Sequence, residues 1–537
     1  MTKIEKTTLT LFWMFTAAIT SLPYLLGWLL AGNGFSYTGL LLAVEDGNSY
    51  LAKMLSGANG AWLFRTPYTA FSQKGFLAFL PYLILGKISA LFDGYFARIF
   101  LFHVFRLVGI GFTTFVLYRF ISLFVEDFRF RFLTLVLVTF GGGLGFLYVL
   151  GFSNLWKEMP LEFYSPETFG FLAFLAIPHL VWARGFLFIG LTKFLQADAD
   201  HEIKQGIEIG LYWNLLALMQ PLTVPVGWLV LTTFTFGEII FGTIRGIRTG
   251  SYFYKMLAKL GMVILISSPL VVYTFVSFQR DPFLKIWAAQ NIILSPPKTD
   301  YLLAYGLVIP IILIGIFRKQ SRRMFESRLL WCWLVILPFL IFFPHLLQRR
   351  LAEGGYVAMS ILAISGMFKP GERIRKTAFL WYSLNFLTTF LFLTGAIITI
   401  SGKPFPLFLS QNETRLLDFV QQKIPTQSVV LADWELSTLL PAHAPVRVII
   451  GHGPESIRGR EINERMKILL SQENPNDFKQ FLQDENVDFW IMNKSQAPCF
   501  FKSNLELEFL IRRYENSKYI LFEFQQTLNS GANEINR

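Results

Sequence analysis

Apolar stretches long enough to cross a bilayer follow one another along the first 400 residues. The hydrocarbon core of a bilayer, about 30 Å thick, needs about 20 apolar residues in a helix, which satisfies its own backbone polar groups. We predict about eleven spans, at residues 9–31, 97–122, 132–151, 169–195, 207–220, 222–243, 256–277, 301–317, 329–347, 352–369 and 378–400. The expected fold class is therefore mainly α, a polytopic membrane helix bundle.

Orientation is predicted from the basic residues in short loops, because cytoplasmic loops carry an excess of Lys and Arg. With a cytoplasmic N-terminus, these loops hold Arg119, Arg129, Arg131, Arg245, Arg248, Lys255, Arg318, Lys319, Arg322, Arg323, Arg328, Arg373, Arg375 and Lys376. The apolar segment Gly75–Phe92 contains Pro81 and Lys87, and a full crossing there would invert every later loop. We predict that it lies in the outer membrane interface. Residues 32–96 then form one extracytoplasmic loop, and the C-terminus is extracytoplasmic.

The C-terminal residues change character from apolar runs to a mixed α/β pattern. Strand-like runs are Val429–Asp433, Arg447–His452, Val487–Met492 and Tyr519–Phe524, and helical patterns are Glu413–Gln422, Arg460–Leu470 and Asp477–Asp484. Strands alternating with helices indicate a small α/β domain. We predict a transmembrane domain at 1–400 and an extracytoplasmic α/β domain at 401–537.

Composition and charge agree with this division. The chain is 53% hydrophobic and 16% charged, with a mean hydropathy of +0.47, whereas soluble proteins are typically about 25% charged. The net charge is +12; residues 401–537 have 15 Lys and Arg against 17 Asp and Glu, so residues 1–400 carry the basic excess. Topology accounts for that excess, and no basic, aromatic-interleaved face indicates nucleic-acid binding. Cys332 and Cys499 are too few and too far apart to suggest a disulfide framework or thiol metal site.

A pair of carboxylates, Glu45 and Asp46, begins a helical pattern in the first outer loop. Tyr50, Leu51, Met54 and Leu55 recur at helical spacing, and Ser49 and Lys53 share the opposite face. We predict an amphipathic helix lying on the membrane. Carboxylates at its N-terminal end are favoured by the helix dipole, so they could be capping groups. They could equally act as a general base or hold a hard divalent cation.

An acidic residue soon after the first span, on a juxtamembrane helix in a long outer loop, resembles the GT-C superfamily of membrane glycosyltransferases. The resemblance extends to the many spans, the interfacial helix at 76–92 and the extracytoplasmic C-terminal domain. In plan the chain is similar to bacterial aminoarabinose transferases and protein O-mannosyltransferases, although Arg65-Thr66-Pro67 stands where those enzymes usually have His-Pro-Pro or Lys-Pro-Pro. The resemblance implies a polyprenyl-phosphate sugar donor, a lipid, glycan or protein acceptor, and Asp46 as catalytic base.

Three arginines are candidates for binding the donor phosphate. Arg349 and Arg350 occupy a short outer turn, against the positive-inside pattern, and a guanidinium fork suits phosphate. Arg106 lies on the outer half of the second span, three residues after His103. Snorkelling to headgroups is the alternative for the pair, and a structural carboxylate or carbonyl is the alternative partner for Arg106.

Further polar residues are candidates for substrate binding. They are Glu167 before the fourth span, His179 within it, and Gln290 and Asn291 in the outer loop 278–300. Glu167 could instead cap a helix, or could join Asp46 as ligand of a divalent cation such as Mg²⁺ or Mn²⁺. The turn Gly451-His452-Gly453-Pro454-Glu455 follows a predicted strand, where α/β domains often bind ligands, but such a turn has little specificity by itself.

These features favour an inverting glycosyltransferase in the cell membrane, with Glu45 assisting Asp46. A flippase, transporter or assembly component for lipid-linked glycans would need charged residues along the whole depth of the bilayer. The charged candidates gather on the outer half instead, which favours surface chemistry. A sensor whose ligand binds the C-terminal domain stays open on sequence alone.

Overall fold

The computed structural model describes residues 1–92, 94–196, 201–246, 250–317, 327–368, 376–472, 474–498, 500–501 and 507–525. The chain divides into two compact units. Unit 1 comprises residues 1–26, 100–280 and 292–401, and unit 2 comprises residues 27–99, 281–291 and 402–537.

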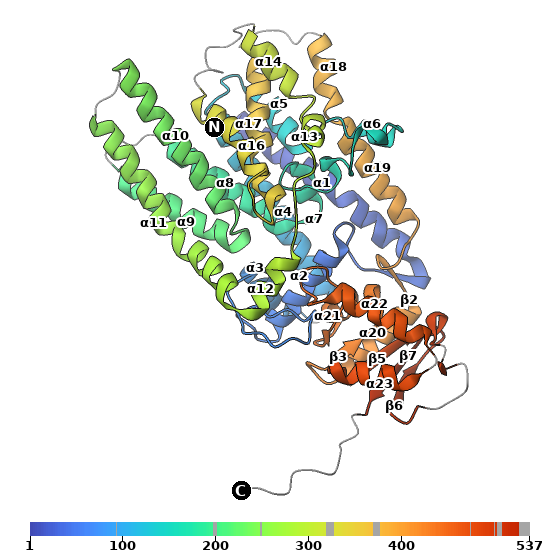
Figure 1. The fold of residues 1–537 in the computed structure, drawn as a ribbon. Helices are drawn as coiled ribbons and strands as arrows, with labels where there is room; N and C mark the ends of the chain where they lie inside the picture. Colours follow the sequence, from blue (N-terminus) through green and yellow to red (C-terminus); the bar gives the residue numbers. More distant parts are fainter. Residues whose placement is uncertain are drawn as a thin grey trace, which may run out of the picture. The chain divides into compact units, whose positions relative to one another are not determined.

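Unit 1 is a bundle of helices (Figure 1). Two of its helices begin or end in unit 2, namely α1 (Lys3–Ala31) and α4 (Tyr95–Ile121). The others are α5 (Phe128–Phe140), α6 (Phe146–Val149), α7 (Gly170–Ala176), α8 (Pro178–Leu195), α9 (Glu202–Met219), α10 (Thr223–Arg245), α11 (Gly250–Arg280), α13 (Lys298–Ala304), α14 (Ile309–Phe317), α16 (Arg328–Ile341), α17 (Gly355–Met367), α18 (Lys376–Leu384) and α19 (Leu387–Ser401).

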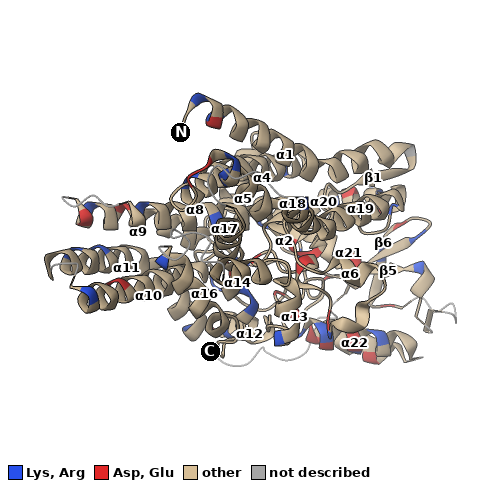
Figure 2. Cartoon of the chain, turned by 90° about the horizontal axis from the view of Figure 1, so that it is seen from above, with Lys and Arg blue, Asp and Glu red and all other residues tan. Residues whose placement is uncertain are grey.

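Each predicted span overlaps one or two helices of this bundle. Within the described residues, five helices are long and apolar enough to cross a membrane, or six if the pair α13 and α14, bent by 73°, is one span. The charged residues of α9, α10 and α11 lie mainly toward the helix ends (Figure 2). The predicted polytopic helix bundle is confirmed. Of the basic residues used to predict orientation, Arg248, Arg318, Lys319, Arg322, Arg323, Arg373 and Arg375 lie outside the described residues, as does Cys499.

Several predicted spans are broken rather than continuous. The stretch 132–151 ends its first helix at Phe140, because Gly141, Gly142 and Gly143 follow. A Cβ at Gly143 would lie 2.0 Å from the Ala304 carbonyl oxygen, so close backbone approach requires glycine there. The stretch 169–195 breaks at Ile177, directly before Pro178, since a residue preceding proline is disfavoured in helical conformation.

Unit 2 contains a five-stranded mixed sheet in the order β4-β3-β5-β7-β6. The strands are β3 (Val429–Leu431), β4 (Arg447–Val448), β5 (Phe489–Asn493), β6 (Leu510–Glu515) and β7 (Tyr519–Phe524); β3 pairs in parallel with β4 and β5, and β7 pairs antiparallel with β5 and β6. Buried residues of α20 (Gln411–Lys423) and α21 (Trp434–His443) belong to one core cluster with Val430. Those of α22 (Gly459–Ser471) and α23 (Pro475–Asp484) belong to a second with Val429 and Leu431.

The α/β prediction for the C-terminal region is thus confirmed, with differences in detail. The run predicted at 447–452 is a strand only to Val448, because a turn begins before Gly451, which has φ +115°. Helix α21 and strand β6 were not predicted. Three residues of β6 are half-buried and three are exposed, and this sheet-edge position leaves little apolar alternation to detect.

Segments far away in the sequence complete unit 2. They supply β1 (Phe35–Tyr37), which pairs with β2 (Phe408–Ser410), and helices α2 (Val44–Ala58), α3 (Leu80–Ser89) and α12 (Pro282–Gln290). The loop 32–96 therefore packs with residues 402–537 in one compact unit. Within the segment 76–92 the structure has the shorter helix α3, since Pro81 lies at its start, and its location in the membrane interface stays a prediction.

Candidate active site

Helix α2 presents its two carboxylates in its first turn. The helix begins at Val44, and the preceding Ala43 has left-handed geometry (φ 47°) and makes no side-chain capping bond. Glu45 and Asp46 therefore follow the N-cap, and the capping interpretation of the pair is wrong. Their position still benefits from the positive end of the helix dipole.

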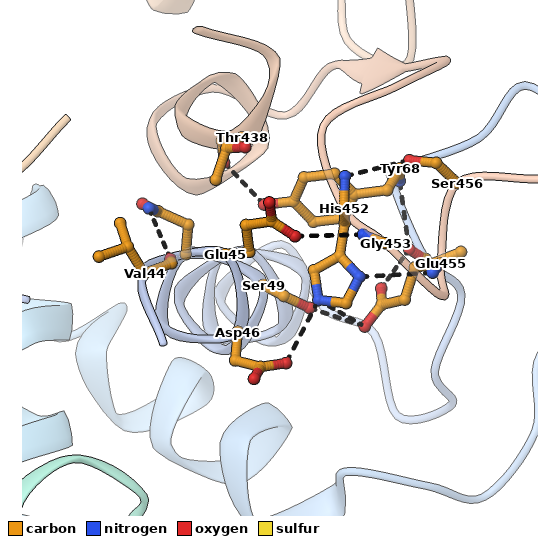
Figure 3. Close-up of polar contacts among 12 residues, drawn as sticks. Val44, Glu45, Asp46, Ser49, Tyr68, Thr438, His452, Gly453, Glu455 and Ser456 are labelled. Carbon is orange, nitrogen blue, oxygen red and sulfur yellow. Dashed lines mark hydrogen bonds and ion pairs between the residues drawn. The ribbon is translucent and has the colours of Figure 1, made fainter. Parts of the chain in front are cut away.

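The two carboxylates have different surroundings (Figure 3). Glu45 accepts a hydrogen bond from the Trp434 indole (2.8 Å) through Oε1 and one from the Gly453 amide (3.2 Å) through Oε2. Both oxygens are thus bonded to residues of the C-terminal region. Glu45 holds α2 against α21 and the turn that follows β4.

Asp46 is accessible, with its side chain 51% exposed. Its Oδ1 lies 3.4 Å from Nε2 of His452, whose side chain is only 5% exposed. The geometry thus combines a solvent-facing carboxylate with a buried imidazole from a residue 406 positions later in the chain. A carboxylate that is both reachable and oriented meets the geometric requirement for a general base.

His452 is held on several sides by residues of unit 2 (Figure 3). Its backbone amide donates to Ser456 Oγ (3.2 Å), and its Nδ1 accepts from the Glu455 amide (3.3 Å). The Tyr68 ring packs on the imidazole at a centroid separation of 5.3 Å, and the Tyr68 hydroxyl donates to the Thr438 carbonyl (2.8 Å). Burial would lower the pKa of His452, but the Glu455 and Asp46 carboxylates raise it.

A buried ion pair lies directly behind this contact. Lys53 Nζ is 2.7 Å from Glu455 Oε1, with side-chain exposures of 1% and 4%. Glu455 also accepts hydrogen bonds from Ser49 (2.8 Å) and Thr66. Burial alone would raise the pKa of Glu455, but Lys53, His452 and the hydrogen bonds lower it to about 2. This carboxylate is therefore ionised and paired, as a buried charge requires.

The ion pair corrects the expected environment of α2. Ser49 and Lys53 were predicted on a polar face at the membrane surface, but each is 1% exposed. The Lys53 ammonium also lies over the rings of Phe79 (4.2 Å) and Phe64 (4.9 Å). Sequence reasoning identified neither Lys53 nor Thr66 as site residues. The only signal for Lys53 was a lysine on the polar face of an amphipathic helix, and a solvated face explains that pattern equally well.

The side-chain amide of Gln290, predicted to bind substrate, forms hydrogen bonds with the protein backbone. Its Nε2 donates to the carbonyls of Pro454 (3.3 Å) and Ser456 (3.1 Å), and its Oε1 accepts from the Arg458 amide (2.9 Å). The side chain therefore fixes the turn that contains His452. Asn291, the C-cap of α12, is half-buried, and its backbone N–H donates to the Trp287 carbonyl.

In unit 1, the structure brings three of the predicted residues together. Arg350 Nε lies 3.5 Å from Glu167 Oε1. The neighbouring Arg349 guanidinium lies 4.4 Å from the Tyr164 ring centroid, and its Nε is buried with no hydrogen-bond partner among the described residues. Arg184, behind Glu167, forms a buried ion pair with Glu353 (2.6 Å) and donates to the Glu167 carbonyl. Glu167 precedes the N-cap of α7, Phe169, so it caps no helix.

Arg106 and His179 lie elsewhere in unit 1. Arg106 is 1% exposed and donates to Thr20 Oγ1 (3.0 Å), Ser21 Oγ (3.0 Å) and the Phe174 carbonyl (2.9 Å). Arg106 therefore has hydrogen-bond partners within the protein, as in the structural alternative to phosphate binding. His179 is half-buried in the first turn of α8, next to Pro178.

The predicted cation ligands do not form a recognisable metal site. Among the described residues, no three or more His, Cys, Asp or Glu side chains are grouped so that they could hold a metal ion. Asp46 belongs to unit 2 and Glu167 to unit 1. The Glu167 carboxylate also has the Arg350 guanidinium beside it, which disfavours a second cation there.

Comparison with solved structures identifies the fold. AftD, an arabinofuranosyltransferase from Mycobacteria, has a TM-score of 0.54 at 11% identity, covering 97% of this chain and 40% of that chain. ArnT from Cupriavidus metallidurans in the apo state has a TM-score of 0.51 at 10% identity, covering 95% of this chain and 97% of that chain. A scan of family models and a search of curated proteins found no match.

Both solved structures are GT-C glycosyltransferases, so the chain has the GT-C fold predicted from its sequence. Together with its apolar helices, this fold makes it a multi-pass membrane protein.

Proposed function

We propose that this protein is a membrane glycosyltransferase that moves a sugar from a polyprenyl-phosphate donor to an extracytoplasmic acceptor, with Asp46 as the base. The observation that carries the proposal is the half-exposed Asp46 carboxylate in the first turn of α2, 3.4 Å from a buried histidine. The GT-C fold supports it, because both neighbours at TM-scores above 0.5 share that glycosyltransferase class.

The proposed reaction is a single displacement at the anomeric carbon. An acceptor hydroxyl oxygen forms the new bond to this carbon as its proton passes to Asp46. The bond from the anomeric carbon to the phosphate oxygen breaks, and its electron pair leaves with polyprenyl phosphate. Attack from the face opposite the leaving group inverts the configuration. Glu45 supports the base indirectly, because its carboxylate holds Trp434 and Gly453.

For the donor phosphate we propose Arg349 and Arg350 of unit 1. The Nε of Arg349, which is buried and has no hydrogen-bond partner in the part of the chain that the structure describes, supports this role, because an ionised donor without a partner is costly unless a ligand supplies one. Arg350 is the exposed member of an ion pair with Glu167, with side-chain exposures of 31% and 6%. A phosphate would exchange one anionic partner of Arg350 for another. Arg106 has enough neutral partners to be stable without phosphate.

The test uses purified full-length protein in liposomes with a panel of pentosyl and hexosyl polyprenyl phosphates as donors and a cell-envelope extract as the source of acceptor hydroxyls. Release of free polyprenyl phosphate is measured for wild type, Asp46→Asn and the control Asp418→Asn, an exposed aspartate on α20 of the same unit. Loss of a general base predicts a fall of about 10²–10⁴-fold for Asp46→Asn. Asp418→Asn should match wild type. Donor release by Asp46→Asn at the wild-type rate, or none by folded wild-type protein, would contradict the proposal.

A further inference from the structure

The turn at residues 451–456 is joined to α2 and to neighbouring segments of unit 2 by several hydrogen bonds and an ion pair. Glu45 binds its Gly453 amide, and Gln290 binds its Pro454 and Ser456 carbonyls. Lys53, Ser49 and Thr66 bind the Glu455 carboxylate. The turn therefore has a defined position relative to the first turn of α2, within one compact unit.

These attachments leave one side chain of the turn directed at the proposed base. His452 Nδ1 accepts the Glu455 amide hydrogen, so the ring proton of the neutral imidazole resides on Nε2. Nε2 is the atom that lies 3.4 Å from Asp46 Oδ1. In the neutral ring that accepts at Nδ1, this nitrogen carries the hydrogen and can donate it to the carboxylate.

We infer that His452 is a positioning residue for the transfer reaction, donating from Nε2 to Asp46 and holding the carboxylate in the orientation needed to accept the acceptor's proton. The inference rests on the proposed function and extends it, because it makes the C-terminal region part of the active site. His452 is not the base, since its Nδ1 is occupied and its Nε2 bears a proton. The Lys53–Glu455 pair acts one step further back by holding the turn itself.

We expect an effect of the size of a hydrogen bond to an ionised group, about 1.5–3 kcal/mol and thus about 10- to 100-fold in rate. His452→Phe keeps a ring against Tyr68 but removes the donor, so kcat should fall by about 10- to 100-fold while KM for the donor lipid changes less than about twofold. His452→Gln offers an amide hydrogen at a similar reach and should recover most of the activity.

The matched control is His443→Phe. His443 is a second, half-buried histidine of unit 2, stacked on Tyr95 with 4.1 Å between ring centroids. Phenylalanine preserves that stacking. This variant should keep wild-type kinetics, so it separates loss of the His452 donor from a general cost of removing a histidine.

The experiment measures kcat and KM for donor release by wild type, Asp46→Asn, His452→Phe, His452→Gln and His443→Phe in the same liposomes. The tautomer of His452 is read from ¹⁵N-histidine NMR of the wild-type protein, with His452→Gln assigning its signal. Loss in His452→Phe with recovery in His452→Gln, together with an Nε2-bound proton, is the expected result. If His452→Phe fails to fold, the NMR tautomer and the activity of His452→Gln decide.

Two results would overturn the inference while leaving the proposed function intact: His452→Phe working at the wild-type rate while Asp46→Asn is inactive, or His452→Gln being as impaired as His452→Phe. Absence of donor release by folded wild type would instead overturn the proposed function, and the positioning role with it.

Discussion

Glu45 and Asp46 are adjacent in the chain and yet have different tasks in the structure. A helix turns by 100° per residue, so neighbouring side chains point in different directions. Glu45 points at Trp434 and Gly453, whereas Asp46 is half-exposed beside His452. The half-exposed Asp46 carboxylate is the better candidate for proton transfer, because an acceptor can reach it.

The Lys53–Glu455 pair leads to a stability prediction at the same scale. Lys53→Met leaves the Glu455 carboxylate buried without its cation, and breaking a buried pair in this way typically costs about 3–5 kcal/mol. We expect a clear fall in the thermal unfolding midpoint of the detergent-solubilised protein. Lys467→Met, at an exposed position on α22, should shift it little. Equal midpoints for the two variants would show that the pair contributes no net stability.

At the scale of elements, the position of α2 depends on its crossing with α3. A Cβ at Gly57 would lie 2.1 Å from the Leu83 carbonyl oxygen, and one at Gly86 would lie 1.9 Å from the Met54 carbonyl oxygen. Each glycine thus lets the backbone of one helix touch that of the other. The stacked rings of Tyr50 and Tyr82, 4.6 Å apart, add to the same contact.

We therefore expect Gly86→Ala to force α2 and α3 apart, because the clashing atom belongs to the backbone and cannot rotate away. Both the thermal midpoint and donor release should fall, since Asp46 moves with α2. Gly34→Ala is the control, as its Cβ would meet no atom within 4 Å. Wild-type activity and stability in Gly86→Ala would mean that the two helices can separate without displacing the site.

At the scale of the whole molecule, orientation in the membrane stays a prediction from the basic loops. In a background with Cys332 and Cys499 replaced by Ser, we expect Lys467→Cys to react with a membrane-impermeant maleimide in intact cells. Lys3→Cys, near the N-terminus, should react only after lysis, because that end is predicted to be cytoplasmic. Both positions are exposed in the structure. The reverse labelling pattern would invert the topology and place Asp46 on the wrong side for an extracytoplasmic acceptor.

The apolar pattern was sufficient for the helix bundle, because each membrane span must satisfy its own backbone hydrogen bonds and so has a local signature. Helices α20, α22 and α23 also have a local signature, because each has an apolar stripe that packs on a sheet. The helix breaks at Gly141–Gly143 and at Ile177 were not predicted, although the glycines and the proline that follows Ile177 are plain in the sequence. Whether glycine or proline interrupts a span depends on the neighbouring segment, here the Ala304 carbonyl for Gly143.

The site shows the same division between local and long-range information. Asp46 could be proposed from its place after the first span, and the turn at 451–455 from its place after a strand. Their contact could not, since 406 positions separate Asp46 from His452 and the packing of unit 2 alone brings them together. The sequence by itself determined the class of fold, and its resemblance to the GT-C superfamily made Asp46 the candidate base. Only the tertiary structure decided that Lys53 is buried against Glu455, because a lysine is a surface residue unless a distant segment brings it a counter-charge.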